Sequence, residues 1–127
     1  MALSSDEIRN TVQRYLDMVA TGTADQIMSM YAENAVLEDP VGSEPRSTAE
    51  SIREFYAMIE PLQSSTTLQT MRVSGQAAAF HFEVRTVVGD TEITVGAIET
   101  MEFDDAGLIT SMRAFWSQDD MTTAPVA

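Results

Sequence analysis

The chain of 127 residues has no cysteine, which excludes disulfide bonds, thiol nucleophiles and thiolate metal sites. Basic residues are scarce too: seven Lys and Arg stand against 20 Asp and Glu, for a formal net charge of −13. Nucleic acids and anionic membrane surfaces both require clustered positive charge, so neither is expected as a partner. His81 is the single histidine, which leaves no His–carboxylate triad and no set of zinc ligands.

Other familiar signals are missing as well. The sequence has no long apolar run and no charged-then-apolar leader, so we expect neither a membrane span nor a secretory signal, and the cytoplasm is the default location. Neither T-G-T-A nor V-V-G-D has the spacing of a phosphate-binding loop. Any catalysis by this chain is therefore expected to use carboxylates and phenols, without a metal or another cofactor.

A hydrophobic content of 44% is typical of a globular protein, and the length fits one domain over residues 1–127, with a frayed tail from about residue 120. The first half has helical spacing. Ser4 and Glu7 form a capping box ahead of an apolar stripe. A second short helix is predicted to place Tyr31 on its apolar face. The stripe of the first helix consists of Ile8, Val12, Tyr15, Leu16 and Val19.

A third helix follows the extended segment V-L-E-D-P and a polar loop. Ser47 and Glu50 fit a capping box at its start, and Pro61 is expected to end it. Its apolar stripe consists of Ile52, Phe55, Tyr56 and Ile59.

The period of the pattern changes to two in the second half, which indicates strands. Residues 78–88, 92–103 and 108–117 form predicted strands, joined by a Gly89-Asp90 hairpin turn and by D-D-A-G. Helices followed by an antiparallel meander predict an α+β fold, with the helices packed on a curved sheet.

Glu99 interrupts an apolar row of the second predicted strand. Parity places it on the same face as Ile93, Val95, Ala97, Met101 and Phe103. A carboxyl buried there is expected to have a raised pKa and to be neutral, and a neutral acid donates a hydrogen bond to a developing oxyanion. A bulge that flips the register, or a salt bridge to an arginine, explains the pattern equally well.

The three tyrosines, Tyr15, Tyr31 and Tyr56, each fall on the apolar stripe of a predicted helix. A buried phenol needs a partner for its hydroxyl group. Three phenols that face one core would bond to one another or to a ligand oxygen, or each would be satisfied by a nearby carbonyl.

The segment V-L-E-D-P-V-G contains two adjacent carboxylates, Glu38 and Asp39. In an extended chain they point to opposite faces, and Pro40 holds Asp39 in an extended conformation. Parity alone does not decide which acid faces inward. A strand end beside a Pro-Gly loop is also a common place for a carboxylate without a function.

Several of these segments resemble the bacterial Δ5-3-ketosteroid isomerases, members of the superfamily with the nuclear-transport-factor-two-like cone fold. The resemblance runs from about residue 8 to residue 118. It rests on R-Y-L-D-M-V, M-Y-A-E-N-A-V-L-E-D-P-V-G, I-R-E-F-Y and M-E-F-D-D-A-G-L-I-T-S-M-R-A-F-W-S. It implies a cone-shaped α+β fold, with N-terminal helices packed on a curved, mainly antiparallel sheet, and a homodimer built on the outer face of that sheet.

The resemblance also implies roles for particular residues. Asp39 matches the catalytic base, Tyr15 matches the oxyanion-binding tyrosine, and Glu99 stands where the family usually has a protonated aspartate. Tyr31 and Tyr56 would support Tyr15 through hydrogen bonds. The wall that binds the steroid would contain Phe82, Val84, Met112 and Trp116.

The activity implied is a cofactor-free isomerisation of Δ5-3-ketosteroids to Δ4-3-ketosteroids through a dienolate, with an apolar 3-ketosteroid as the substrate. A polyketide cyclase of the SnoaL type or another cone-fold enzyme is one alternative, and a non-catalytic domain that binds small hydrophobic ligands or only dimerises is the other. An activity like that of limonene epoxide hydrolase is disfavoured, because Arg72, Arg85 and Arg113 do not share the parity of Glu99.

Overall fold

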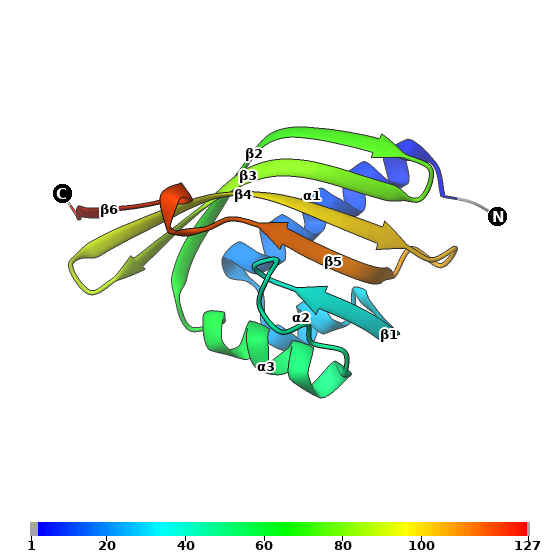
Figure 1. Ribbon diagram of the computed structural model, residues 1–127, viewed down its shortest axis with the longest axis horizontal. Helices are drawn as coiled ribbons and strands as arrows, with labels where there is room; N and C mark the ends of the chain where they lie inside the picture. Colours follow the sequence, from blue (N-terminus) through cyan, green and yellow to red (C-terminus); the bar gives the residue numbers. More distant parts are fainter. Residues whose placement is uncertain (1–2, 127) are drawn as a thin grey trace.

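The computed structural model describes residues 3–126 of the chain. Three helices pack on a curved sheet of six strands, and the two ends of the described chain lie at opposite ends of the long axis (Figure 1). The elements in chain order are α1 (Ser5–Thr21), α2 (Ala24–Met28), β1 (Tyr31–Glu38), α3 (Ala49–Ile59), β2 (Gln63–Ser74), β3 (Ala77–Val88), β4 (Thr91–Phe103), β5 (Ile109–Phe115), the 3-10 helix η1 (Gln118–Asp120) and β6 (Met121–Pro125).

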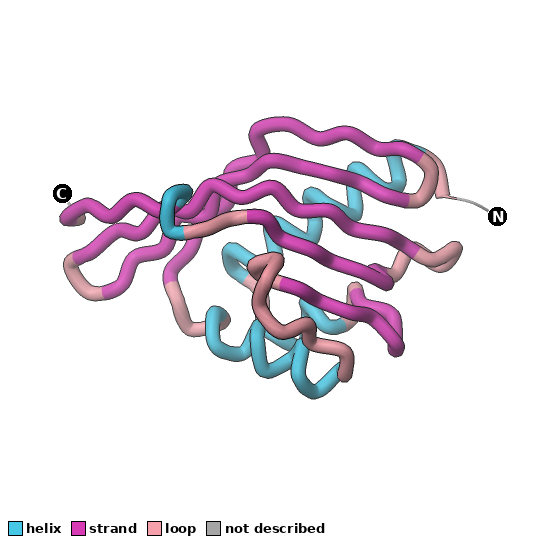
Figure 2. The backbone as a smooth tube through the Cα atoms, in the orientation of Figure 1, coloured by secondary structure: helices cyan, strands magenta, loops and turns pink. Residues whose placement is uncertain are grey.

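The sheet has the strand order β1-β5-β4-β3-β2, and β6 pairs with β4 beyond the end of β5. All pairs are antiparallel except β1 with β5, which run parallel. These two strands are neighbours in the sheet although they lie far apart in the sequence. Figure 2 shows the strands as one bent layer beside the helices. The predicted cone-shaped α+β fold with a mainly antiparallel sheet is thereby confirmed.

The first helix begins as its sequence predicts. The Ser4 hydroxyl accepts a hydrogen bond from the Glu7 N–H, and the Glu7 carboxylate accepts one from the Ser4 N–H, so both halves of the capping box are present. The predicted box at Ser47 is wrong by one residue. Thr48 is the extended residue before α3, and its hydroxyl accepts from the Ser51 N–H at 3.1 Å.

The prediction of a helix that carries Tyr31 is also wrong. The second helix is a single turn and a half that ends at Met28, and Tyr31 is the first residue of β1. Ile27 and Tyr31 are four residues apart, which is a helical spacing, but the chain turns at Ser29 and enters the sheet. Tyr31 still faces the core, as expected, with 6% of its surface exposed.

The expected frayed tail is wrong for residues 121–125. They form β6, which pairs with residues 91–95 of β4 along an edge that β5 leaves uncovered. Free backbone groups on that edge provide partners for a segment with little apolar character. Strand β2 was not predicted at all, because its polar run S-S-T-T lacks an alternating apolar pattern.

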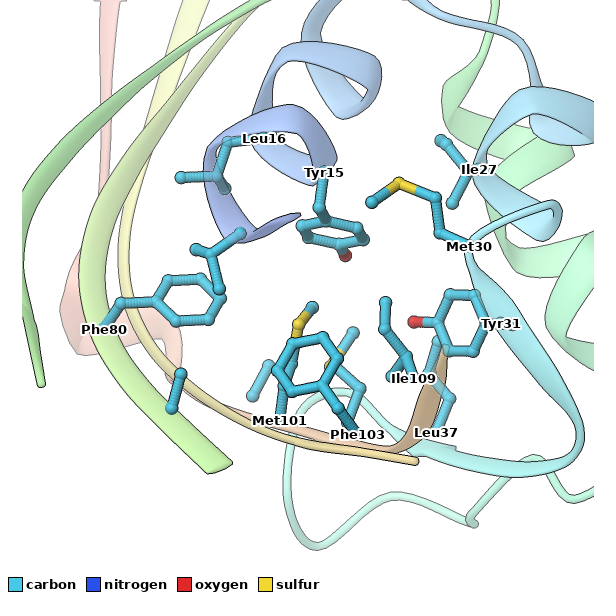
Figure 3. Close-up of a cluster of buried hydrophobic side chains, with 14 of the residues drawn as sticks. Tyr15, Leu16, Ile27, Met30, Tyr31, Leu37, Phe80, Met101, Phe103 and Ile109 are labelled. Carbon is cyan, nitrogen blue, oxygen red and sulfur yellow. The ribbon is translucent and has the colours of Figure 1, made fainter. Parts of the chain in front are cut away.

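Buried and more exposed side chains alternate along β3 and β4, as predicted. On β3 the residues Ala78, Phe80 and Phe82 are buried, and on β4 the buried set is Ala97, Glu99, Met101 and Phe103. Gly89 has φ of 61°, and the turn that it forms with Asp90 joins the facing residues Val88 and Thr91. The core between this sheet face and the helices is apolar except for Glu99 and the phenol oxygens. Figure 3 shows part of its hydrophobic cluster, with side chains from the helices and from the sheet.

Candidate active site

A cavity of about 270 Å³ lies between α1, α3 and the curved face of the sheet. This volume is close to the lower end of the range of about 300–1,000 Å³ that ligand pockets occupy. Its wall is largely apolar, and few polar side chains reach it. They are Tyr15, Asp39, Tyr56, Ser64, Thr86, Glu99 and Trp116.

Asp39 is the acid of the V-L-E-D-P-V-G segment that lines the cavity. Its Oδ1 accepts a hydrogen bond of 2.7 Å from the indole N–H of Trp116. Beyond Pro40, the Val41 N–H donates to the Ala114 carbonyl at 2.8 Å, which fixes the segment against β5. Burial raises the pKa of Asp39, and the Trp116 hydrogen bond partly opposes that effect.

Glu38 points away from the cavity. Its carboxylate forms an ion pair with Arg113 at 3.0 Å and accepts a weaker hydrogen bond from the Gly42 N–H. The Arg113 hydrogen bond contributes most to lowering the pKa of Glu38. The two neighbouring acids therefore have opposite environments and opposite pKa shifts.

Glu99 is the single polar residue in the buried core of residues 3–126, with 3% of its surface exposed. It stands in regular register between Phe80 of β3 and Ala114 of β5, so no bulge turns it outward. The ion pairs of residues 3–126 do not include it, and its Oε1 is buried without a hydrogen-bond partner among them. Burial, and then the negative charge of Asp39, raise the pKa of Glu99 far above its usual value. This shift favours the neutral, protonated form of the side chain.

The three phenols form one hydrogen-bonded chain. The Tyr56 hydroxyl lies 2.8 Å from that of Tyr15 and 2.5 Å from that of Tyr31. Figure 3 shows the Tyr15 and Tyr31 oxygens pointing into the same interior, from α1 and from the start of β1. Burial is the main cause that raises the pKa of all three, so they are neutral donors.

The direction of this chain matters because each phenol has one O–H to donate. Tyr15 and Tyr56 line the cavity, whereas Tyr31 lies behind them. If Tyr31 donates to Tyr56 and Tyr56 donates to Tyr15, the Tyr15 O–H remains free for an oxygen in the cavity. This order places one phenol donor in the same cavity as the unpartnered acid of Glu99.

Three of the four predicted wall residues, Phe82, Val84 and Trp116, line the cavity. The fourth, Met112, does not: it is completely buried in the core and faces Leu37 and Met101 of the neighbouring strands. Ala114, two residues further along the same strand face, occupies the wall instead.

Ser64 and Thr86 also line the cavity, although neither was among the residues predicted for the site. Thr86 shares the parity of Phe82 and Val84, which was the signal available for it. Ser64 had none, since it lies at the start of β2, where the sequence has no alternating apolar pattern.

Arginines and metal-binding clusters do not contribute to this cavity. None of the described residues that line it is basic, so an Asp-Arg-Asp set is not formed. Within residues 3–126, no group of three or more His, Asp or Glu side chains is placed to hold a metal ion. No helix in the same range combines the length and the apolar character that crossing a membrane requires.

Most of the chain is similar to known proteins. The model of the SnoaL-like domain family matches residues 12–112. Steroid Delta-isomerase of Nocardioides simplex is 44% identical over 121 residues, which cover 95% of this chain and 98% of that protein.

A solved structure of SalBIII shares the fold. SalBIII is described as an epoxide hydrolase/cyclase-like enzyme with a role in pyran ring formation in the polyether salinomycin. It superposes with a TM-score of 0.89 at 24% identity, over 95% of this chain and 98% of that one. The family match and the 44% identity together establish that this chain belongs to the SnoaL-like domain family, in the group that contains steroid Delta-isomerase.

Proposed function

We propose that this protein is a steroid Δ-isomerase that converts Δ5-3-ketosteroids to Δ4-3-ketosteroids without a cofactor. The observation that supports this most is the buried, unpartnered carboxyl of Glu99 in the same apolar cavity as Asp39 and Tyr15. Such a cavity suits a substrate that is almost entirely hydrocarbon and carries one reactive ketone. The near-complete alignment with a steroid Delta-isomerase supports the same reaction.

Asp39 is the proton carrier in this proposal. Its carboxylate removes a proton from the carbon between the ketone and the isolated double bond, which produces a dienolate. The protonated Asp39 then returns that proton two carbons further along, and the product is the conjugated enone. Burial raises the pKa of Asp39, and this strengthens it as a base, while the Trp116 hydrogen bond keeps the carboxylate oriented.

Tyr15 and Glu99 stabilise the dienolate oxygen. Each would donate one hydrogen bond to it, from a neutral group in a site with few other polar atoms. Ketosteroid isomerase is itself the known example of an acid that an apolar site keeps neutral, so this role for Glu99 follows the family. The hydroxyls of Tyr56 and Tyr31 would fix the direction in which the Tyr15 O–H points.

The test is to mix the protein with a Δ5-3-ketosteroid and to follow the near-ultraviolet absorbance of the conjugated enone. Asp39→Asn is expected to lower kcat by at least about 100-fold, because it removes the general base. Glu38→Gln is the matched control: it neutralises the adjacent acid, which faces Arg113, and should change kcat little. Equal losses in both variants would refute the assignment of the base. Steroid binding without any product would indicate the carrier function instead.

We further propose that the protein is a cytoplasmic homodimer whose subunits meet through the outer face of the sheet. Three apolar side chains are exposed on that face: Ile98, Phe115 and Val36. Ile98 and Phe115 face each other on β4 and β5, so they form one patch. Sedimentation velocity of the protein and of Ile98→Asp tests this: the first should sediment as a dimer and the second as a monomer.

A further inference from the structure

Two hydroxyl side chains in the cavity wall have no part in the proposed chemistry. Ser64 of β2 and Thr86 of β3 face each other directly in the sheet, and both line the cavity. Their oxygens are 3.3 Å apart, which is longer than the usual O–H···O separation of about 2.7–2.8 Å. One such bond uses one donor and one acceptor. The pair therefore has a second O–H and free lone pairs to offer to a ligand in the cavity.

A neighbouring hydroxyl shows what a purely structural role looks like. Thr66, two residues after Ser64 on β2, donates to the Leu16 carbonyl at 3.1 Å and so ties the sheet to α1. Neither Ser64 nor Thr86 has such a backbone partner among the hydrogen bonds of residues 3–126.

The hydroxyl pair lies at the far end of the cavity from Glu99. Phe80 faces Glu99 across β3 and β4, and Thr86 is six residues further along β3, a distance of roughly 20 Å at the usual rise of a strand. Apolar residues line the cavity between these two levels: Phe82 and Val84 on β3, and Ala97 and Val95 on β4. The cavity is therefore an apolar trough with hydrogen-bonding groups at both ends.

A steroid with an oxygen at each end has the matching length. Four fused rings extend over roughly 10 Å at ordinary carbon–carbon bond lengths. Two terminal C–O bonds and a hydrogen bond at each end bring the span between protein groups to roughly 18 Å. This is close to the separation between Glu99 and Thr86 along the strands, which a twisted strand shortens slightly.

We infer that Ser64 and Thr86 determine specificity for the end of the substrate remote from the reacting ketone. They would bind a carbonyl or hydroxyl oxygen on the five-membered ring or on the first carbon of its side chain. This inference rests on the proposed function, which directs the 3-ketone to Tyr15 and Glu99. The preferred substrates are then Δ5-3-ketosteroids that carry a second oxygen, rather than those with a bare hydrocarbon end.

The test compares two Δ5-3-ketosteroids that differ only in the far oxygen. Thr86→Val and Ser64→Ala, alone and together, are expected to raise KM for the oxygenated substrate about three- to tenfold and to leave kcat unchanged. KM for the substrate without that oxygen should not rise. Thr86→Ser keeps the hydroxyl and should restore the wild-type ratio. Thr67→Val is the control, because it makes the same substitution at an exposed position of β2 outside the cavity.

The decisive quantity is the ratio of kcat/KM for the two substrates, since general damage to the site lowers both values. An unchanged ratio, within twofold, in the double variant that still isomerises both steroids would overturn the inference and leave the proposed function intact. If wild-type protein isomerises neither steroid, the proposed function fails, and this inference fails with it. Circular dichroism identifies any variant that does not fold, in which case the two single variants carry the test.

Discussion

Replacing Glu99 by methionine should make the protein more stable and less active. The Glu99 carboxyl is buried, and its Oε1 has no hydrogen-bond partner among residues 3–126. An unsatisfied buried polar group of this kind costs about 1–3 kcal/mol. Methionine is unbranched, close to glutamate in length and apolar, so it fills the space with little strain. The free energy of unfolding should therefore rise by about 1–3 kcal/mol, which for a chain of this length corresponds to roughly 4 °C in Tm per kcal/mol.

The same substitution should lower kcat about 100- to 1,000-fold, because it removes one of the two donors proposed for the dienolate oxygen. The remaining donor, Tyr15, does not depend on Glu99 for its position, since its hydroxyl is held by Tyr56. A large loss of kcat in a protein that unfolds at a higher temperature would separate the catalytic role of the acid from a structural one.

Thermal unfolding by circular dichroism and the enone assay measure the two effects. Glu102→Met is the matched control: it makes the same substitution three residues along β4, at an exposed position on the opposite face. It should change the free energy of unfolding by less than about 0.5 kcal/mol and leave kcat as it is. The reasoning is refuted if Glu99→Met unfolds at a lower temperature than the wild type, or if it keeps wild-type activity.

Three further predictions concern Asp39, Glu99 and the start of α3. Trp116→Phe removes a hydrogen bond that lowers the pKa of Asp39, so the acidic limb of the kcat/KM profile should move to higher pH; a limb that stays in place would contradict the role of this contact. Burial raises the pKa of Glu99, so above about pH 4.3 the unfolded chain loses a proton that the folded protein keeps. The free energy of unfolding of the wild type therefore falls as pH rises. Urea denaturation from about pH 4 to pH 7 should show that this fall is smaller in Glu99→Gln than in the wild type. Thr48→Ala should lower the free energy of unfolding by about 1 kcal/mol and Ser47→Ala by much less, because Thr48 caps α3. Thermal unfolding measures both, and the reverse order would support Ser47 as the cap.

The local features of the site were predictable because they depend on short-range alternation. The burial of Glu99 follows from its parity in a strand that pairs regularly on both sides. The inward orientation of Tyr15 and Tyr56 follows from helical stripes that the structure retains. The prediction failed where the spacing fits both a helix and a strand. Tyr31 lies four residues after the apolar Ile27 of α2, but it belongs to β1.

The features that join distant segments were not predictable from patterns. Parity could not choose between Glu38 and Asp39, because the choice is made by Arg113 and Trp116, which lie more than 70 residues away along the chain. Met112 has the parity of a wall residue, yet it is buried in the core, and Ala114, two residues further along the same face of β5, lines the cavity. The family resemblance selected Asp39, which lines the cavity, and Met112, which does not, so roles transferred from a family have to be compared with the geometry of the individual chain.

The parallel pairing of β1 with β5 has a consequence for how the protein acquires its activity. Asp39 and Trp116 are separated by 77 positions, and the strands that bring them together are the first and the fifth of the six along the chain. Contacts between such distant segments close large loops and tend to form late in folding. Recovery of turnover in a refolding experiment should therefore lag behind recovery of helical and hairpin signals. In this protein enzymatic activity would serve as a sensitive indicator that β1 has paired with β5.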